Sequence, residues 1–213
     1  MAASDKLFNL NCTRCPRLAL FLSEIRREFP AYHGKPVPPF GDAKSRFLIV
    51  GLAPGKHGAN ATGRPFTGDY AGILLYETLH KFGFASASTS TALDDGLELF
   101  NCRITNAVKC LPPENKPVGT EIGTCNYYLV NELKALPGNS IVLALGTIAH
   151  NAVLRAMGQK LSAFKFGHNV VHEPVAGLTL IDSYHCSRYN TQTRRLTPKM
   201  FEQVFQRATE LLA

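Results

Sequence analysis

Residues 46–72, RFLIVGLAPGKHGANATGRPFTGDYAG, decide the fold of this chain. The stretch begins with the apolar run 47–50, whose length and β-branched content are typical of a buried strand. A long glycine-rich loop follows, and residues 71–82 are predicted to form a helix. A loop of this length between a core strand and a helix is usually functional, because ordering it costs entropy.

The loop also has the chemistry of a binding loop. Its glycines allow close backbone approaches, and Lys56, His57 and Arg64 give it positive charge. It therefore suits an anionic or planar ligand held against backbone N–H groups. It is not a phosphate P-loop, because Val50 and His57 stand where that motif needs glycine and Ser or Thr. Its glycines also lack the spacing of the dinucleotide-binding fingerprint.

The composition narrows the class of protein. The 213 residues, 45% of them hydrophobic, are enough for one domain with a real core. No apolar run approaches the roughly 20 residues of a membrane helix, and the N-terminal stretch MAASDKLFNLNC lacks the pattern of a secretion signal. We therefore expect no membrane association and a cytoplasmic location. The net charge of +7 favours a nucleic-acid partner, although a merely basic soluble surface is the alternative.

Short apolar strands alternate with longer helices along the chain. This order predicts an α/β fold with a largely parallel sheet covered on both faces. In such sheets ligands bind beyond the carboxyl ends of the strands, so the glycine-rich loop, Asn106 and His185 are expected in one cleft. The predicted strands are 47–50, 103–108, 140–145, 169–172 and 178–182, the last two as a hairpin, and the predicted helices are 17–29, 71–82, 120–136, 147–157 and one from Thr197 onward.

Four of the six cysteines suggest a metal site. Cys12 and Cys15 form a C-x2-C pair, Cys110 follows a predicted strand, and Cys125 lies on the next predicted helix. In a cytoplasmic chain such cysteines favour a metal or iron–sulfur site over disulfides. The spacing alone leaves zinc and [4Fe–4S] both open. The alternative is a set of buried free thiols, which is the better interpretation for Cys102.

Several segments together resemble the motifs of one enzyme family, the family 5 (type b) uracil-DNA glycosylases of bacteria and archaea. The likeness runs from Cys12 to about residue 198, and its long first motif is specific. The matching segments are Gly51-Leu52-Ala53-Pro54, Thr62-Gly63-Arg64-Pro65-Phe66-Thr67-Gly68-Asp69, Thr105-Asn106-Ala107-Val108-Lys109-Cys110, Leu143-Ala144-Leu145-Gly146 and Ser183-Tyr184-His185-Cys186-Ser187.

The resemblance implies a fold, a cofactor and an activity. The fold would be a three-layer α/β/α uracil-DNA glycosylase domain over 1–213, with a central parallel four-stranded sheet. A [4Fe–4S] cluster on Cys12, Cys15, Cys110 and Cys125, rather than zinc, would tie the N-terminal segment to the body. The activity would be hydrolysis of the N-glycosidic bond of uracil and other deaminated bases in DNA, leaving an abasic site for base excision repair. The protein would act as a monomer on DNA in the nucleoid.

The resemblance also assigns binding roles. A base inside a duplex must flip out to be cut, and Phe66 would stack on it; the alternative is that Phe66 plugs the core. Asn106 offers a donor and an acceptor that match the edge of uracil; the alternative is a strand-end cap. Gly51, Ala53 and His57 of the first motif would close around the base and sugar.

Two residues are candidates for the chemistry. His185 would donate a hydrogen bond to the base oxygen where negative charge develops. Many relatives in the superfamily place a polar residue after the first-motif glycine, but this chain has Leu52 there, which cannot orient water. Asp69 is then the nearest carboxylate for positioning water or stabilising the sugar cation. Its alternative role is to cap the helix that follows.

The remaining basic residues are candidates for DNA contacts. Arg64, Lys56, Arg188 and Arg194 are candidates for phosphate binding, and Arg188 with Tyr189 could fill the space left by the flipped base.

Two other functions remain open at this stage. Leu52 would also suit a DNA-binding module with a structural metal and no catalysis. A relative that traps the sugar covalently through a histidine is the other alternative. The joint presence of Phe66, Asn106, His185 and Asp69 favours the hydrolytic glycosylase. Because no lysine is placed by a motif as a nucleophile, we expect a monofunctional enzyme without a lyase step.

Overall fold

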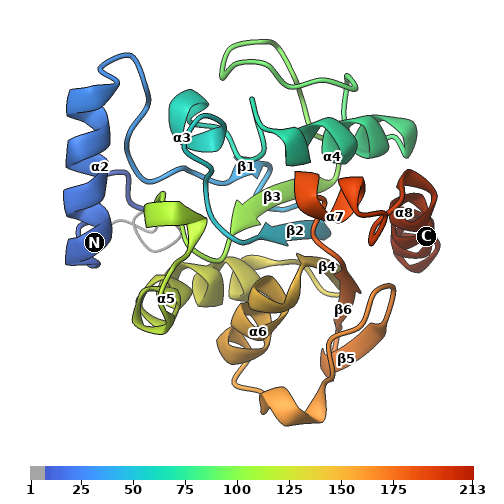
Figure 1. The fold of residues 1–213 in the computed structure, drawn as a ribbon. Coiled ribbons are helices and arrows are strands. Elements are labelled where there is room, and N and C mark those ends of the chain that lie inside the picture. The colour runs from blue at the N-terminus through green and yellow to red at the C-terminus, as the bar shows by residue number, and fades with distance from the viewer. Residues whose placement is uncertain (1–7) are drawn as a thin grey trace.

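The computed structural model describes residues 8–213 (Figure 1). The first seven residues, which belong to the stretch that led us to expect no secretion signal, lie outside the described part. A mixed sheet of six strands in the order β1-β3-β2-β4-β6-β5 forms the centre. Its strands are β1 Phe40–Gly41, β2 Phe47–Gly51, β3 Cys102–Asn106, β4 Ser140–Leu145, β5 Val171–Val175 and β6 Leu178–Ser183.

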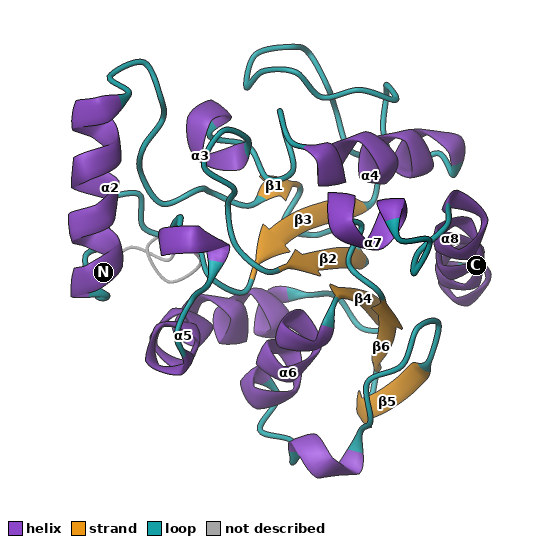
Figure 2. Ribbon diagram, viewed as in Figure 1, coloured by secondary structure: helices purple, strands orange, loops and turns teal. Residues whose placement is uncertain are grey.

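Helices surround this sheet (Figure 2). The longer ones agree with the predicted helices to within one or two residues at the start. The helices are α2 Pro16–Glu28, α3 Ala59–Thr62, α4 Tyr70–Lys81, α5 Gly119–Ala135, α6 Thr147–Ala156, α7 Arg188–Gln192 and α8 Pro198–Leu212, with single 3₁₀ turns at Pro113–Asn115 and Leu161–Ala163.

The predicted four-stranded parallel sheet is correct for the centre and wrong for the edges. β3, β2, β4 and β6 are parallel to one another. β1 and β5 extend the sheet antiparallel at its two edges. β5 and β6 form the predicted hairpin, whereas β1 has two residues and is too short to leave a periodic pattern. The short helices α3 and α7 lie inside predicted loops for the same reason.

The three layers follow from alternation along the central strands. In β2, Leu48 and Val50 pack in one apolar cluster with α2, α5 and α6. Phe47 and Ile49 pack in a second cluster with α4 and α8. Because successive side chains of a strand point to opposite faces, a strand whose residues are all buried needs helices on both sides, as Figure 1 shows.

The carboxyl ends of the parallel strands meet at one edge. Gly51 of β2 lies opposite Asn106 of β3, and Leu145 of β4 lies opposite Ser183 of β6. The glycine-rich loop, the segment after β3, the start of α6 and the segment 184–188 therefore leave the sheet together. Within residues 8–213, no helix is both long and apolar enough to cross a membrane.

Candidate functional site

A cavity of about 470 Å³ opens at this sheet edge. Its size is in the range of small-ligand sites, and mostly apolar walls with a few polar groups are typical of them. All four strand-end segments contribute to it. The residues around it include Leu52, Ala53, Gly55, Phe66, Asp69, Asn106, Asn115, Gly146, Thr147, Ile148, His185 and Arg188.

Phe66 is held in an unusual backbone conformation. Its φ is 57°, in the left-handed region that bulky residues avoid. Its carbonyl oxygen lies so close to Gly72 that a Cβ there would be 1.7 Å away. The ring is 5% exposed and belongs to the α4/α8 apolar cluster, yet it lines the cavity. Phe66 therefore packs in the core and also lines the cavity, and its stacking on a base stays a prediction.

Asn106 and Gly51 are in direct contact at the floor of the cavity. Asn106 is 4% exposed and ends β3. A Cβ on Gly51 would lie 2.4 Å from Asn106 Oδ1 and 2.6 Å from Phe66 Cζ. Only glycine at position 51 leaves room for the amide and the ring side by side. Gly51 thus acts through its two neighbours that line the cavity and does not line it itself.

His185 lies beside Phe66. The two ring centroids are 6.1 Å apart and the ring planes differ by 29°. Burial lowers the pKa of His185 to about 4, so the imidazole is neutral at pH 7. Nδ1 is buried without a hydrogen-bond partner among the described residues. The tautomer with its proton on Nε2 leaves that N–H free to donate within the cavity.

Asp69 carries out the capping role and also borders the cavity. Its Oδ1 accepts a hydrogen bond from the Gly72 N–H at 2.8 Å, which caps α4. Burial raises the pKa of its carboxyl group above the usual range, although the hydrogen bonds from the α4 backbone oppose the shift. The carboxyl group is therefore partly desolvated at the cavity wall.

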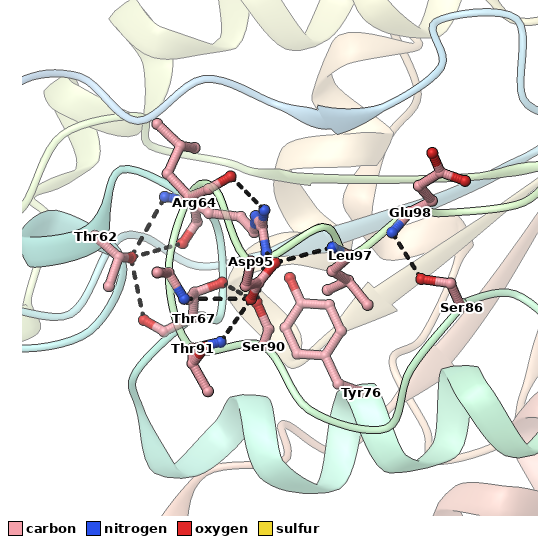
Figure 3. Close-up of polar contacts among 12 residues, drawn as sticks. Thr62, Arg64, Thr67, Tyr76, Ser86, Ser90, Thr91, Asp95, Leu97 and Glu98 are labelled. Atoms are coloured by element: carbon pink, nitrogen blue, oxygen red, sulfur yellow. Dashed lines mark hydrogen bonds and ion pairs between the residues drawn. The ribbon is translucent and has the colours of Figure 1, made fainter.

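Arg64 is not placed to contact DNA, which corrects the sequence prediction. Its side chain is 3% exposed and stacks on Phe40, with 4.5 Å between the guanidinium carbon and the ring centroid. Figure 3 shows it pointing into the loop 86–97. There Nη1 donates to Asp95 Oδ1 at 2.6 Å and Nη2 to the Leu93 carbonyl at 2.6 Å.

The contacts of Arg64 belong to a polar network behind the glycine-rich loop (Figure 3). The Thr67 and Ser90 hydroxyl groups are 2.6 Å apart. The Tyr76 hydroxyl donates to the Pro65 carbonyl at 2.8 Å. These bonds hold the residues on either side of Phe66, so they fix the segment that carries its strained backbone.

The other predicted basic residues divide between the cavity and the surface. Arg188 lines the cavity mouth, and its guanidinium carbon lies 5.8 Å from the centroid of the Tyr70 ring. Tyr189 is 71% exposed, and Arg194 is also exposed. The structure brings all three to the surface of the segment that follows His185.

Lys56 and His57 lie outside the cavity. Lys56 Nζ is 3.3 Å from Glu28 Oε1, and His57 Nδ1 is 2.9 Å from the Tyr32 hydroxyl. Both contacts join the glycine-rich loop to the end of α2 and the residues after it. The predicted substrate role of His57 is therefore not supported by its position.

The cavity residues that the sequence analysis did not name as site residues include Thr147, Ile148 and Asn115. Thr147 and Ile148 begin α6 directly after β4, and the rule that ligands bind at strand ends could have included them. Asn115 sits in the turn PPEN with a φ of 57°. Asparagine tolerates this region of φ. The two prolines before it indicate a turn, but nothing in the sequence indicates that Asn115 lines a cavity.

The four predicted metal-binding cysteines come together. Cys12, Cys15, Cys110 and Cys125 line one narrow pocket between the N-terminal turn, the segment after β3, and α5. None is in a disulfide. Four thiolates from separate segments at one pocket are a donor set that fits either a [4Fe–4S] cluster or a single zinc ion.

A second group of potential ligands is satisfied without metal. Among residues 8–213, His150, His172 and Asp182 have ligand atoms within 4.8 Å of one another. Asp182 Oδ1 lies 2.7 Å from His150 Nδ1, and its Oδ2 lies 3.0 Å from His172 Nε2. Burial alone would lower the pKa of His150, but its hydrogen bond and charge interaction with Asp182 raise it. This group is a buried hydrogen-bonded network behind the sheet edge.

The family model and the sequence relatives agree with one another. The family model described as "Uracil DNA glycosylase superfamily" matches residues 38–209. The Type-5 uracil-DNA glycosylase of Thermus thermophilus is 44% identical, over 94% of this chain and 93% of its own length. That of Pyrobaculum aerophilum is 42% identical, over 93% and 88%. The crystal structure of wild-type Pedobacter heparinus SMUG2 covers 79% of this chain and 76% of its own at a TM-score of 0.49 and 16% identity.

The Arg64–Asp95 pair is expected to stabilise the protein. Asp95→Asn leaves the buried guanidinium without its counter-charge, so the free energy of unfolding should fall by about 3 kcal/mol in denaturant titrations. Burial alone would raise the pKa of Asp95, but the Arg64 hydrogen bond holds it well below the usual range. This stability is therefore present above the unfolded pKa of about 4 and is lost as pH falls through the folded value.

Asp94→Asn is the matched control, because Asp94 is an exposed neighbour and should leave the unfolding free energy within about 0.5 kcal/mol of wild type. Equal stability of the two variants would show that Arg64 does not depend on Asp95.

Proposed function

The chain belongs to the uracil DNA glycosylase superfamily, and we propose that its cavity at the sheet edge hydrolyses the N-glycosidic bond of uracil in DNA. It is a hydrolase of base excision repair, like its type-5 relatives. The observation that carries the proposal is the convergence of Phe66, Asn106 and His185 on one cavity. The finer proposals are that the enzyme is monofunctional, that it also accepts other deaminated bases, and that it acts as a cytoplasmic monomer on nucleoid DNA.

Base recognition requires the target nucleotide to leave the duplex. Phe66 stacks on the flipped base, and this contact accepts any base because every base has a flat π-face. The Asn106 amide supplies one donor and one acceptor to the edge of uracil. Ala53 lies against the base from the cavity wall, and Gly51 keeps the floor open for both side chains.

His185 stabilises the departing base. As the glycosidic bond breaks, negative charge grows on the uracil oxygen, and a preorganised donor lowers the energy of that transition state. The neutral imidazole donates from Nε2 without changing its own charge. Its low pKa, about 4, keeps it in this form across the neutral range.

Asp69 acts on the sugar side. The deoxyribose becomes cation-like, and a carboxylate near it stabilises that charge and orients the attacking water. Leu52 and Ala53 border the cavity but carry no polar group that could replace it. Asp69 uses Oδ1 for the helix cap, which leaves Oδ2 for this role.

DNA binding is assigned to the rim of the cavity. Arg188 binds a phosphate beside the flipped nucleotide, and the exposed Tyr189 fills the gap that it leaves. Arg194 adds a positive charge on the same surface, and Lys56 on the glycine-rich loop is a further phosphate contact when it leaves Glu28. Buried Arg64 is not among these contacts.

Cys12, Cys15, Cys110 and Cys125 would hold a [4Fe–4S] cluster. Its contribution is structural, because four thiolates from separate segments tie the N-terminal turn to α5 and to the segment after β3. Zinc is the alternative occupant and would serve the same purpose.

The activity test uses a labelled duplex with one uracil. The expected product is an abasic strand that stays intact until alkali is added, because no lysine nucleophile is placed for a lyase step. Strand scission without alkali would contradict the monofunctional assignment, and a persistent protein–DNA adduct on denaturing gels would indicate covalent trapping. Parallel duplexes with hypoxanthine, xanthine or ethenocytosine define the base range.

The two catalytic roles can be separated by variants. His185→Ala should lower the single-turnover rate by about 10²- to 10³-fold, because one oxyanion donor is lost. Asp69→Asn should also lower the rate but keep the melting temperature, because asparagine caps helices as well as aspartate does. Since burial raises the pKa of Asp69, the wild-type rate should fall on acidification already above the ordinary aspartate range, and Asp69→Asn should lack this fall.

Asp69→Ala is the control for capping and should lose rate and stability together. Full activity of Asp69→Asn would show that Asp69 serves only as a helix cap and has no role in the reaction.

The metal assignment is tested on the purified protein. Anaerobic purification should give a brown protein with about four iron atoms per chain, and Cys12→Ser should lose that iron. Cys102→Ser is the matched control, because Cys102 is a buried thiol outside the cysteine pocket and should retain full iron content. A colourless protein with one zinc per chain would identify the other metal.

A further inference from the structure

Lys109 is a buried cation that the proposed chemistry does not use. It is 2% exposed and does not line the base cavity. Its Nζ lies 2.7 Å from Glu132 Oε1 and 2.9 Å from the Asn106 carbonyl oxygen, and it also bonds the Thr105 hydroxyl. All three hydrogens of the ammonium group therefore have acceptors.

Stability alone is a weak explanation for this network. Burying an ammonium and a carboxylate costs solvation, and apolar residues of similar size often serve equally well. Glu132 Oε2 is buried and accepts no hydrogen bond among the described residues; its charged partner there is Arg103, whose Nε is 3.8 Å away.

The backbone of Lys109 is fixed at the cysteine pocket. Its N–H donates to Cys125 Sγ at 3.3 Å, and its carbonyl accepts from the Val37 N–H at 2.7 Å. Lys109 also borders that pocket. From this fixed point its side chain turns back to the end of β3, which is where Asn106 lies.

The backbone at the end of β3 is held from two sides, by the segment after β2 and by Lys109. The ladder between β2 and β3 stops at the pair Gly51 and Asn106. Beyond it, the Ala107 N–H donates to the Gly51 carbonyl at 2.9 Å and the Val108 N–H to the Leu52 carbonyl at 3.0 Å. The Lys109 ammonium donates a hydrogen bond to the Asn106 carbonyl at this point. The orientation of Asn106 therefore depends on the position of Lys109.

We propose that Lys109, paired with Glu132, is a positioning residue that holds Asn106 in register with the base cavity. The inference rests on the proposed role of Asn106 in reading the base. It adds a link between the cysteine pocket and the base cavity, since one residue is fixed at the first and bonds the strand end at the second.

The test removes both charges together. Lys109→Met alone leaves Glu132 unpaired and can unfold the protein, so the informative variant is Lys109→Met with Glu132→Gln. It should stay folded and keep its iron, because the buried ammonium and carboxylate are removed together and Arg103, the other partner of Glu132, keeps its hydrogen bond to the Gly41 carbonyl. Its single-turnover uracil excision should fall about tenfold or more, because small misplacements at a reacting centre are costly.

A double-mutant cycle with Asn106→Ala separates positioning from general structure. If Lys109 acts through Asn106, the Lys109→Met/Glu132→Gln change should add no further loss of rate once Asn106 is alanine. Independent, multiplicative losses would overturn the proposal. Full wild-type activity of the charge-free variant would overturn it as well.

Hydrogen exchange gives a readout that does not depend on activity. The Ala107 and Val108 amides should exchange faster in the charge-free variant. The control is Lys81→Met with Glu202→Gln, which removes a surface pair between α4 and α8 and should leave both amides and the rate unchanged. Wild-type protein that fails to excise uracil would contradict the proposed function, whereas unchanged exchange of these amides would contradict the role of Lys109.

Discussion

The left-handed backbone of Phe66 is the constraint on which the base cavity depends. This conformation is unfavourable for a phenylalanine, by about 1–2 kcal/mol, and persists only where its surroundings hold it. Behind the glycine-rich loop, the Arg64 side chain is hydrogen-bonded to the loop 86–97. The Tyr76 hydroxyl donates to the Pro65 carbonyl. In front, Gly72 leaves space for the Phe66 carbonyl. The ring is thus placed by contacts that lie away from the cavity.

Two buried cations flank the cavity, and neither is placed in it. Arg64 fixes the loop that carries Phe66, and Lys109 bonds the strand end that carries Asn106. Each is neutralised by a carboxylate, Asp95 or Glu132. A side chain that stacks on a base or hydrogen-bonds its edge must be held to within fractions of an ångström to act on a transition state. Polar contacts outside the cavity supply this support, because the cavity itself is lined mainly by apolar groups.

The placement of the site could be predicted because it follows from sheet topology. The apolar runs around Ile49 and Leu143 are strands buried on both faces, and parallel strands must end at one edge. That rule brings Asn106 and His185 together without knowledge of any contact. The edge strand β1 was not predicted, since a two-residue strand leaves no period to detect, whereas β5 was predicted in the hairpin with bounds of 169–172 in place of Val171–Val175.

The order of elements, the shared strand-end edge and, through the motifs, the family can all be inferred from the sequence alone. These depend on periodicity and local spacing, which the chain carries along its length. The burial of Arg64 away from DNA, and the position of Asp69 both at the cap of α4 and beside the cavity, become visible only in the folded chain. A charged residue looks the same in sequence whether its partner is a phosphate or a distant aspartate, because the burial that decides between them comes from segments far away in the chain.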